Sequence, residues 1–190
     1  MLRKKDKSIR VTIDYQYLNS VTERVAYPFP FADDIFSKLS CALFFTVIDL
    51  TSGYYQVLLD PKCRSYTAFI CSKGCFEYLV LPMGLTNAVE TFQRLMNEVL
   101  SGLLNKICQE YLDDIIIYSL TLSDHIEHVK QVVDRLNQHN LKIKLAKCKI
   151  AQKKIEYLSH VISYGKITPS PNKVKDLLKL NAPLTRMKNT

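Results

Sequence analysis

The fold is read most directly from residues 111–119, whose sequence is YLDDIIIYS. Asp113 and Asp114 stand side by side, and the isoleucines that follow them form a run typical of a buried strand. Adjacent carboxylates repel each other, so their place beside apolar residues needs an explanation. They could form a turn, cap a helix or bind a cation. Residues 107–111 also suit a strand, so the pattern predicts a hairpin with the aspartates at its tip.

A third aspartate favours the cation. Asp49 lies near the end of ALFFTVIDL (residues 42–50), which is a second predicted buried strand. Three carboxylates at the ends of buried strands would raise one another's pKa unless a cation neutralised them. Mg²⁺ prefers carboxylate oxygens, and two such ions about 3.5–4 Å apart can serve a nucleotidyl transfer. The residues therefore predict metal-dependent nucleotidyl transfer, with turn formation as the alternative explanation of the aspartates.

The charge of the chain points to nucleic acid. The 190 residues carry a formal charge of +8, and the lysines and arginines gather in residues 1–10 and 142–154. A basic block is usually a solvated face, but two blocks and an overall excess favour binding to a phosphate backbone. No apolar run is long enough for a membrane helix, and no signal peptide precedes the basic start. These features predict an intracellular protein that does not enter a membrane.

Cysteine and histidine spacing gives no metal framework. The six cysteines include no CxxC pair, so we expect reduced thiols. His125 and His128 form an HxxH pattern on a predicted helix, and without a cysteine pair nearby we expect them on an exposed face.

Strands and helices alternate without a regular βαβ rhythm, which predicts an α+β fold. We expect strands at 9–15 and 42–50, a helix at 31–39, and hairpins at 66–81 and 155–163. Thr86 or Asn87 should cap one further helix. Ser123 should cap another, which ends at Asn140 and whose inner face carries Ile126, Val129, Val133 and Leu136.

Six stretches, in order, resemble the reverse transcriptases of gypsy-like LTR retrotransposons. They are LRKKDKSIRVTIDYQYLN (2–19), VIDLTSGYYQV (47–57), TAFICSKGCFEYLVLPMGLTNAVETFQRLMNEVL (67–100), YLDD (111–114), KIKLAKCKI (142–150) and EYLSHVIS (156–163). The resemblance implies a right-hand polymerase fold whose antiparallel palm sheet is backed by helices. It assigns 1–24 and 57–87 to the fingers, 25–56 and 88–165 to the palm, and 166–190 to the start of a thumb that is largely missing.

The resemblance also assigns roles to single residues. The metal-binding catalytic residues would be Asp49, Asp113 and Asp114, with the backbone carbonyl of Leu50 beside them and Lys147 protonating the departing pyrophosphate. The remaining roles fall into two sets: Lys4, Arg10, Tyr54 and Met83 for the incoming nucleotide, and Tyr111, Leu158 and Ser159 for primer and template.

The implied activity is RNA-directed DNA synthesis with two Mg²⁺ ions, or with Mn²⁺. The implied partners are an RNA or DNA primer–template and deoxyribonucleoside triphosphates. The ribonuclease H and integrase regions of a full Pol polyprotein are not visible in these 190 residues. Such a protein would act in the cytoplasm, in the nucleus or in virus-like particles.

Some positions depart from the family pattern. Gln16 stands where an arginine is usual, Val89 and Glu90 replace Pro-Ala, and Ser159 replaces a glycine. These departures keep a second hypothesis open, in which the chain is a non-catalytic remnant that only binds nucleic acid. Single residues also have ordinary explanations: Tyr54 suits a core, and Lys147 is one of several lysines in its block.

Overall fold

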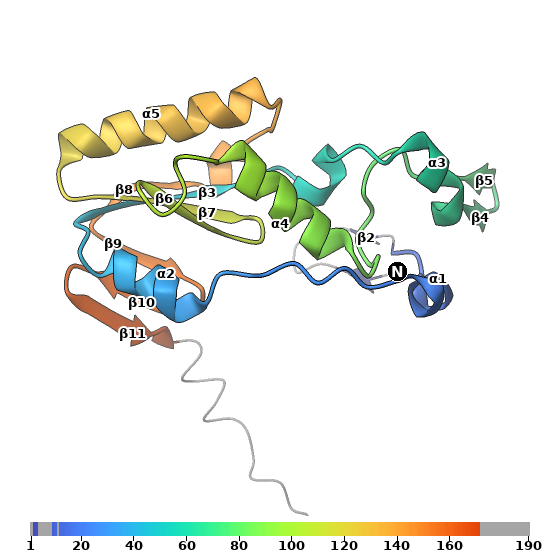
Figure 1. Cartoon of the computed structure of the whole chain (residues 1–190), viewed down its shortest axis with the longest axis horizontal. Helices are drawn as coiled ribbons and strands as arrows, with labels where there is room; N and C mark the ends of the chain where they lie inside the picture. Colours follow the sequence, from blue (N-terminus) through green and yellow to red (C-terminus); the bar gives the residue numbers. More distant parts are fainter. Residues whose placement is uncertain (1, 4–8, 11, 172–190) are drawn as a thin grey trace, which may run out of the picture.

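A computed structural model describes residues 2–3, 9–10 and 12–171 of the chain. Figure 1 shows a larger block of sheets and helices, from which a smaller arm extends. The block contains the two main sheets and the long helices, and the arm contains the short helices and a small hairpin. The predicted α+β class is confirmed.

An antiparallel four-stranded sheet forms the centre of the block. Its strands, in spatial order, are β6 (Cys108–Tyr111), β7 (Asp114–Ser119), β3 (Phe44–Asp49) and β8 (Lys149–Gln152). The predicted strand within 42–50 and the predicted hairpin around the aspartates are both confirmed. The central strands β3 and β7 are the most apolar, as strands covered on both faces must be.

Each face of the central sheet packs against a different layer. Ile115 and Ile117 point to one face, where they pack beneath α4 (Ala88–Val99) and α5 (Leu122–Gln138). Ile116 points to the opposite face, toward α2 (Ala32–Leu39) and a second sheet. The alternation of strand side chains thus explains why this run is apolar at every position.

The second sheet has three antiparallel strands. They are β9 (Lys154–Tyr157), β10 (His160–Ser163) and β11 (Lys166–Pro169), and β10 lies between the other two. The predicted hairpin within 155–163 is confirmed, and its turn is Leu158–Ser159. Both turn residues have a positive φ, 46° and 58°, which side chains other than glycine rarely adopt.

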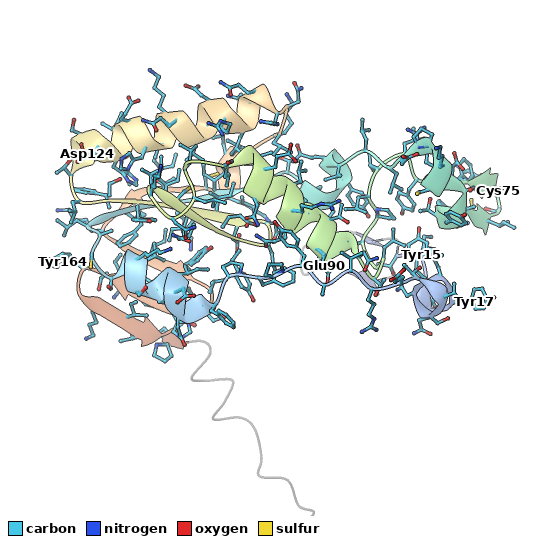
Figure 2. The ribbon with its side chains drawn as sticks, in the orientation of Figure 1. Tyr15, Tyr17, Cys75, Glu90, Asp124 and Tyr164 are labelled. Atoms are coloured by element: carbon cyan, nitrogen blue, oxygen red, sulfur yellow. The ribbon has the colours of Figure 1, made fainter. Side chains whose placement is uncertain are left out.

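The arm is made of short elements. These are β1 (Leu2–Arg3), β2 (Ile9–Arg10), α1 (Gln16–Val21), α3 (Pro61–Arg64), β4 (Phe69–Cys71) and β5 (Gly74–Phe76). Figure 2 shows Cys75 at the tip of the arm and Tyr164 at the opposite end of the molecule. The expected strand at 9–15 was too long, because residues 12–15 are not strand and β2 is described at Ile9–Arg10; the strands expected within 66–81 are likewise shorter.

The described residues also include three short 3₁₀ turns. They are η1 (Gly53–Gln56), η2 (Ser65–Thr67) and η3 (Leu145–Lys147).

Two predicted helix caps need correction. Asn87 stands at the N-cap of α4, but its side chain bonds backbone groups of Glu23 and Val25 instead of the helix. Helix α5 begins two residues earlier than expected, because the Thr121 side chain accepts a hydrogen bond from the backbone N–H of Asp124. Ser123 is therefore not the cap.

The predicted inner face of α5 is confirmed at Val129, Val133 and Leu136, which pack in the core, but it is wrong at Ile126. Ile126 is 64% exposed, whereas His125 is 1% exposed. The His125 ring lies 2.8 Å from the Thr46 hydroxyl and 3.0 Å from the Ser119 hydroxyl, and His128 also contacts Ser119. The HxxH pattern is thus a polar contact between helix and sheet, not an exposed face. Asn140, at φ 59°, follows the helix end as expected.

All six cysteines are free, in agreement with the expected thiols. Across the described residues, no helix is both long and apolar enough to cross a membrane.

Candidate active site

Strand register brings two of the three aspartates together. Asp49, the last residue of β3, lies directly opposite Asp114, the first residue of β7. Directly opposed residues project from the same face with Cβ atoms about 4.5–5.5 Å apart. Because residues alternate along a strand, both carboxylates lie on the face covered by α2 and the second sheet.

The third aspartate lies in the turn between β6 and β7. Tyr111 pairs with Asp114, so Leu112 and Asp113 form the turn between them. Leu112 has a φ of 61°, a conformation that costs a residue other than glycine about 1–3 kcal/mol. Asp113 is exposed at this tip, next to the pair formed by Asp49 and Asp114.

The electrostatics of Asp114 report the proximity of all three groups. Burial raises the pKa of its carboxyl, and the negative charges of Asp113 and Asp49 raise that pKa further. The positive charges of Lys147 and Lys149 lower it. An additional positive charge would therefore stabilise the ionised cluster.

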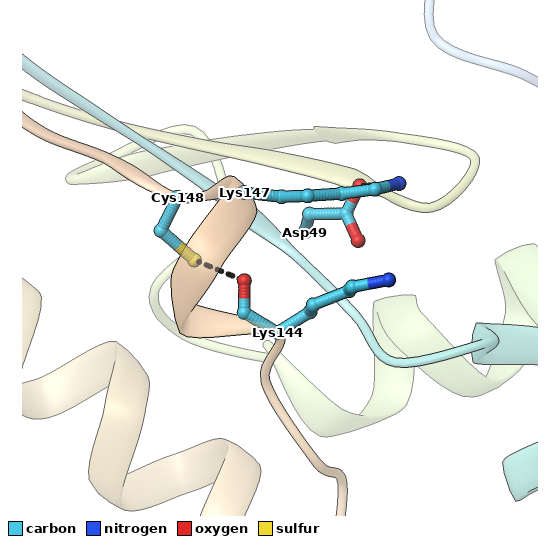
Figure 3. A network of polar contacts seen from close by, with 4 residues as sticks. All are labelled: Asp49, Lys144, Lys147 and Cys148. Atoms are coloured by element: carbon cyan, nitrogen blue, oxygen red, sulfur yellow. Dashed lines mark hydrogen bonds and ion pairs between the residues drawn. The ribbon is translucent and has the colours of Figure 1, made fainter. Parts of the chain in front are cut away.

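Lysines from a distant segment supply part of that charge. Figure 3 shows Lys147 and Lys144 on either side of Asp49. The ammonium nitrogen of Lys147 lies 3.0 Å from a carboxylate oxygen of Asp49, although 98 residues separate them. None of the aspartates has a lysine or arginine beside it in the sequence, so this ion pair arises from the fold alone.

Backbone hydrogen bonds hold the lysine segment against the end of β3. The backbone N–H of Lys144 donates to the carbonyl of Asp49 at 2.8 Å, and Lys147 N–H donates to the carbonyl of Lys144. The Cys148 thiol donates to the same Lys144 carbonyl at 3.4 Å (Figure 3). The position of Lys147 is therefore set by its backbone as well as by its charge.

The carboxylate oxygens of the site are the type of ligand atom that a hard divalent cation prefers. All three aspartates offer carboxylate oxygens, which Mg²⁺ and Mn²⁺ favour. Within the described part of the chain, however, no group of three or more His, Cys, Asp and Glu side chains is arranged to hold a metal ion. Instead, Lys147 engages the Asp49 carboxylate.

A hollow of about 370 Å³ opens beside the aspartates. Its walls include Asp49 and Asp114 from the central sheet and Lys147 from η3. The turn residues Leu158 and Ser159 form the facing wall. The hollow therefore joins the catalytic candidates to two of the three residues expected to touch primer or template.

Tyr54 lies between the core and the site. Its ring packs on Phe92 with centroids 4.9 Å apart. Burial raises the pKa of its hydroxyl, and the charges of Asp113, Glu110 and Glu90 raise that pKa further. The next residue, Tyr55, stacks on Tyr78 instead.

The other predicted residues are placed as follows. Leu50 is buried and bridges to Ile143 across the sheet edge, and Met83 is half-buried in the loop before α4. Arg10 belongs to β2, and Lys4 lies outside the described residues.

Two buried polar residues near the site were missed in the sequence. Glu110 and Gln93 contact each other between β6 and α4, and one side-chain oxygen of each has no partner. Burial raises the pKa of Glu110 to about 8. The burial of Glu110 could have been predicted from the sequence. Glu110 stands two residues after the core residue Cys108 on the same strand, so both side chains point to the same inward face.

Comparisons with known proteins agree with this geometry. Residues 2–162 match the family described as reverse transcriptase (RNA-dependent DNA polymerase). The chain is 44% identical over 174 residues to the retrovirus-related Pol polyprotein from transposon 297 of Drosophila melanogaster, and 37% identical to that from transposon gypsy of the same organism. Each match covers 92% of this chain, but only 16% and 17% of the relatives.

The fold is also similar to a solved structure. A foamy viral protease-reverse transcriptase in complex with double-stranded DNA superposes with a TM-score of 0.87 at 19% identity. The superposition covers 96% of this chain and 32% of the viral one. The predicted polymerase fold is thereby confirmed.

Proposed function

This chain belongs to the reverse transcriptase family, and on that premise we propose that it is an RNA-directed DNA polymerase domain that extends a primer on an RNA or DNA template. The observation that carries the proposal is the pairing of Asp49 with Asp114 at the edge of an open hollow, with Asp113 in the adjoining turn. Carboxylates gathered in such a place repel one another, and a bound cation would stabilise their ionised forms.

Asp49, Asp113 and Asp114 would hold two Mg²⁺ ions, or Mn²⁺, with the Leu50 carbonyl beside them. Bound divalent ions supply positive charge that activates the primer hydroxyl and stabilises the leaving pyrophosphate. The raised pKa of Asp114 is consistent with this assignment, because burial and then the charges of Asp113 and Asp49 outweigh the effect of Lys147 and Lys149.

Lys147 would act on the leaving side of the reaction. The primer 3′ hydroxyl would lose its proton to water as its oxygen bonds to the α-phosphorus and the α–β phosphate bond breaks. The departing pyrophosphate would take a proton from the Lys147 ammonium, which water would then restore. Lys147 already lies 3.0 Å from Asp49, so a modest movement of its flexible side chain would reach the departing phosphate. Once a cation neutralises Asp49, the lysine is free to make that contact.

The remaining residues would bind the substrates. Lys4, Arg10 and Met83 would contact the incoming deoxyribonucleoside triphosphate, and the Tyr54 ring would exclude a 2′-hydroxyl. Tyr111 and the turn Leu158–Ser159 would contact primer and template. The position of Leu158 and Ser159 on the wall of the hollow supports this role for them.

The subdomain assignment stays as proposed from the sequence. Residues 1–24 and 57–87 would form fingers, 25–56 and 88–165 palm, and 166–190 the start of a thumb. The chain spans about a sixth of the length of the curated relatives it matches. We propose that it works as one domain of a longer Pol polyprotein, with ribonuclease H and integrase domains as further parts.

A second candidate function is binding without catalysis. The ion pair between Lys147 and Asp49 favours it, because a carboxylate neutralised by a lysine has less need of a metal. The departure at Ser159 points the same way, since its side chain occupies a turn position with φ 58° that suits glycine.

Primer extension on an RNA template with Mg²⁺ or Mn²⁺ separates the two functions. We expect extension by the wild-type chain and its near-complete loss in Asp113→Asn. Asp134→Asn is the control, because this aspartate is exposed on α5. Tight binding of primer–template without any extension would support the second candidate, and equal extension by both variants would refute the proposed site.

A further inference from the structure

A hydrogen bond from Tyr157 joins the second sheet to the hairpin that carries Asp113 and Asp114. Tyr157 is the last residue of β9 and is 3% exposed. Its hydroxyl donates to the backbone carbonyl of Asp114 at 3.1 Å. A buried tyrosine hydroxyl normally finds such a partner, but here the partner is the backbone of a proposed metal-binding residue.

The position of Tyr157 gives this bond its significance. The next two residues, Leu158 and Ser159, form the turn that faces Asp49 and Asp114 across the hollow. At the far side of the turn, the Ser170 N–H donates to the Ser159 carbonyl at 2.9 Å. The turn is thus anchored at both ends, and one anchor is on the catalytic strand.

The geometry of the side chain suits an anchor. A tyrosine hydroxyl has one proton to donate, and here the Asp114 carbonyl accepts it. The ring packs separately, in the core between α2 and the two sheets.

From this geometry we infer that Tyr157 is a positioning residue, which sets the distance between the primer-facing turn Leu158–Ser159 and the carboxylates at the end of β7. The inference rests on the proposed polymerase function. Nucleotide addition needs the primer end within a few tenths of an ångström of its reacting position, so a small displacement of the turn would slow the reaction. Binding of the substrates depends on many other contacts and would change little.

The alternative is that the hydroxyl contributes only to stability. The two roles differ in what Tyr157→Phe would change, since phenylalanine keeps the ring in the core and removes only the donor. A stability role lowers the fraction of folded protein but not the rate of each folded molecule. A positioning role lowers the rate of each folded molecule.

The matched control is Tyr118→Phe. Tyr118 lies on β7 and packs against the same core cluster, and its hydroxyl accepts a hydrogen bond from the Gln109 amide at 3.4 Å. Single-turnover nucleotide addition should be measured for the wild type and both variants, corrected for the active fraction by titration. The nucleotide KM and the primer–template Kd should be measured alongside.

We expect the addition rate of Tyr157→Phe to fall about tenfold, which is the effect of one hydrogen bond of ordinary strength. KM and Kd should stay within about twofold of the wild type, and Tyr118→Phe should match the wild type. An unchanged rate in Tyr157→Phe, or an equal fall in Tyr118→Phe, would overturn the inference.

Amide hydrogen exchange provides a readout that does not depend on activity. In Tyr157→Phe, exchange should speed up together at the turn 158–159 and at the turn 112–113, and in Tyr118→Phe at neither. Exchange that is unchanged at both turns would overturn the inference. If even the wild-type chain extends no primer, the proposed function fails, while the exchange experiment still decides whether Tyr157 connects the two turns.

Discussion

Replacing Glu110 by glutamine should change how the stability of the protein depends on pH. Glu110 is 2% exposed between β6 and α4; one carboxylate oxygen accepts a hydrogen bond from the Gln93 amide, and the other has no hydrogen-bond partner. Burial raises the pKa of its carboxyl from 4.5 to about 8, the Gln93 hydrogen bond lowers it, and the charge of Asp113 raises it. The folded protein therefore holds a proton that the unfolded chain has released at neutral pH.

The sign of the effect follows from that proton. Between pH 4.5 and about 8 the folded state binds more protons at Glu110 than the unfolded state does. The free energy of unfolding must then fall as pH rises through this window, by at most about 1.4 kcal/mol per pH unit. Raising the pH from about 6 to about 8 should cost roughly 2 kcal/mol at this site. The glutamine variant carries no such charge and should escape the loss.

Urea unfolding of the wild type and of Glu110→Gln at several pH values measures this difference. Glu98→Gln is the control, because Glu98 is exposed on α4, the helix whose Gln93 contacts Glu110. We expect the stability difference between Glu110→Gln and the wild type to grow in favour of the variant as pH rises, and the control to follow the wild type. A stability difference that does not change with pH would show that Glu110 does not stay protonated in the folded protein at neutral pH.

Three further predictions concern the site. Ser159→Gly should raise the free energy of unfolding by about 0.5–1 kcal/mol in urea titrations, because glycine adopts the φ of 58° without strain; a loss of stability would contradict this. Tyr54→Val should admit ribonucleotides in incorporation assays, and unchanged discrimination would return Tyr54 to a core role. Primer–template affinity should fall steeply from about 50 to 200 mM salt with little dependence on sequence, and binding that is insensitive to salt would count against the basic surfaces.

Local patterns predicted the strands and most of the helices, because burial determines residue type there. The run of isoleucines in β7 predicted a strand covered on both faces, and the structure has one. Errors occurred where a side chain made a long-range contact instead of a local one. Asn87 bonds the chain near residue 24 instead of capping α4, and His125 turns inward to meet Thr46.

The site was less predictable than the fold for the same reason. That three aspartates should lie near one another followed from their places at strand ends, but the register that opposes Asp49 to Asp114 is a property of the assembled sheet. Lys147 was proposed only through resemblance, because nothing local connects it to Asp49. The buried Glu110 could have been found from alternation with Cys108, whereas the bond from Tyr157 to Asp114 has no local pattern.

The strand order β6-β7-β3-β8 has a consequence for synthesis of the protein on the ribosome. Strand β3 emerges first, yet both of its neighbours follow much later; Thr46 and its contact Ala151, for example, are 105 residues apart. At roughly 5–20 residues per second, an apolar strand stays unpaired for several seconds or longer. Contacts of such high sequence separation also slow folding itself. The nascent chain therefore has an apolar strand exposed to aggregation throughout this interval.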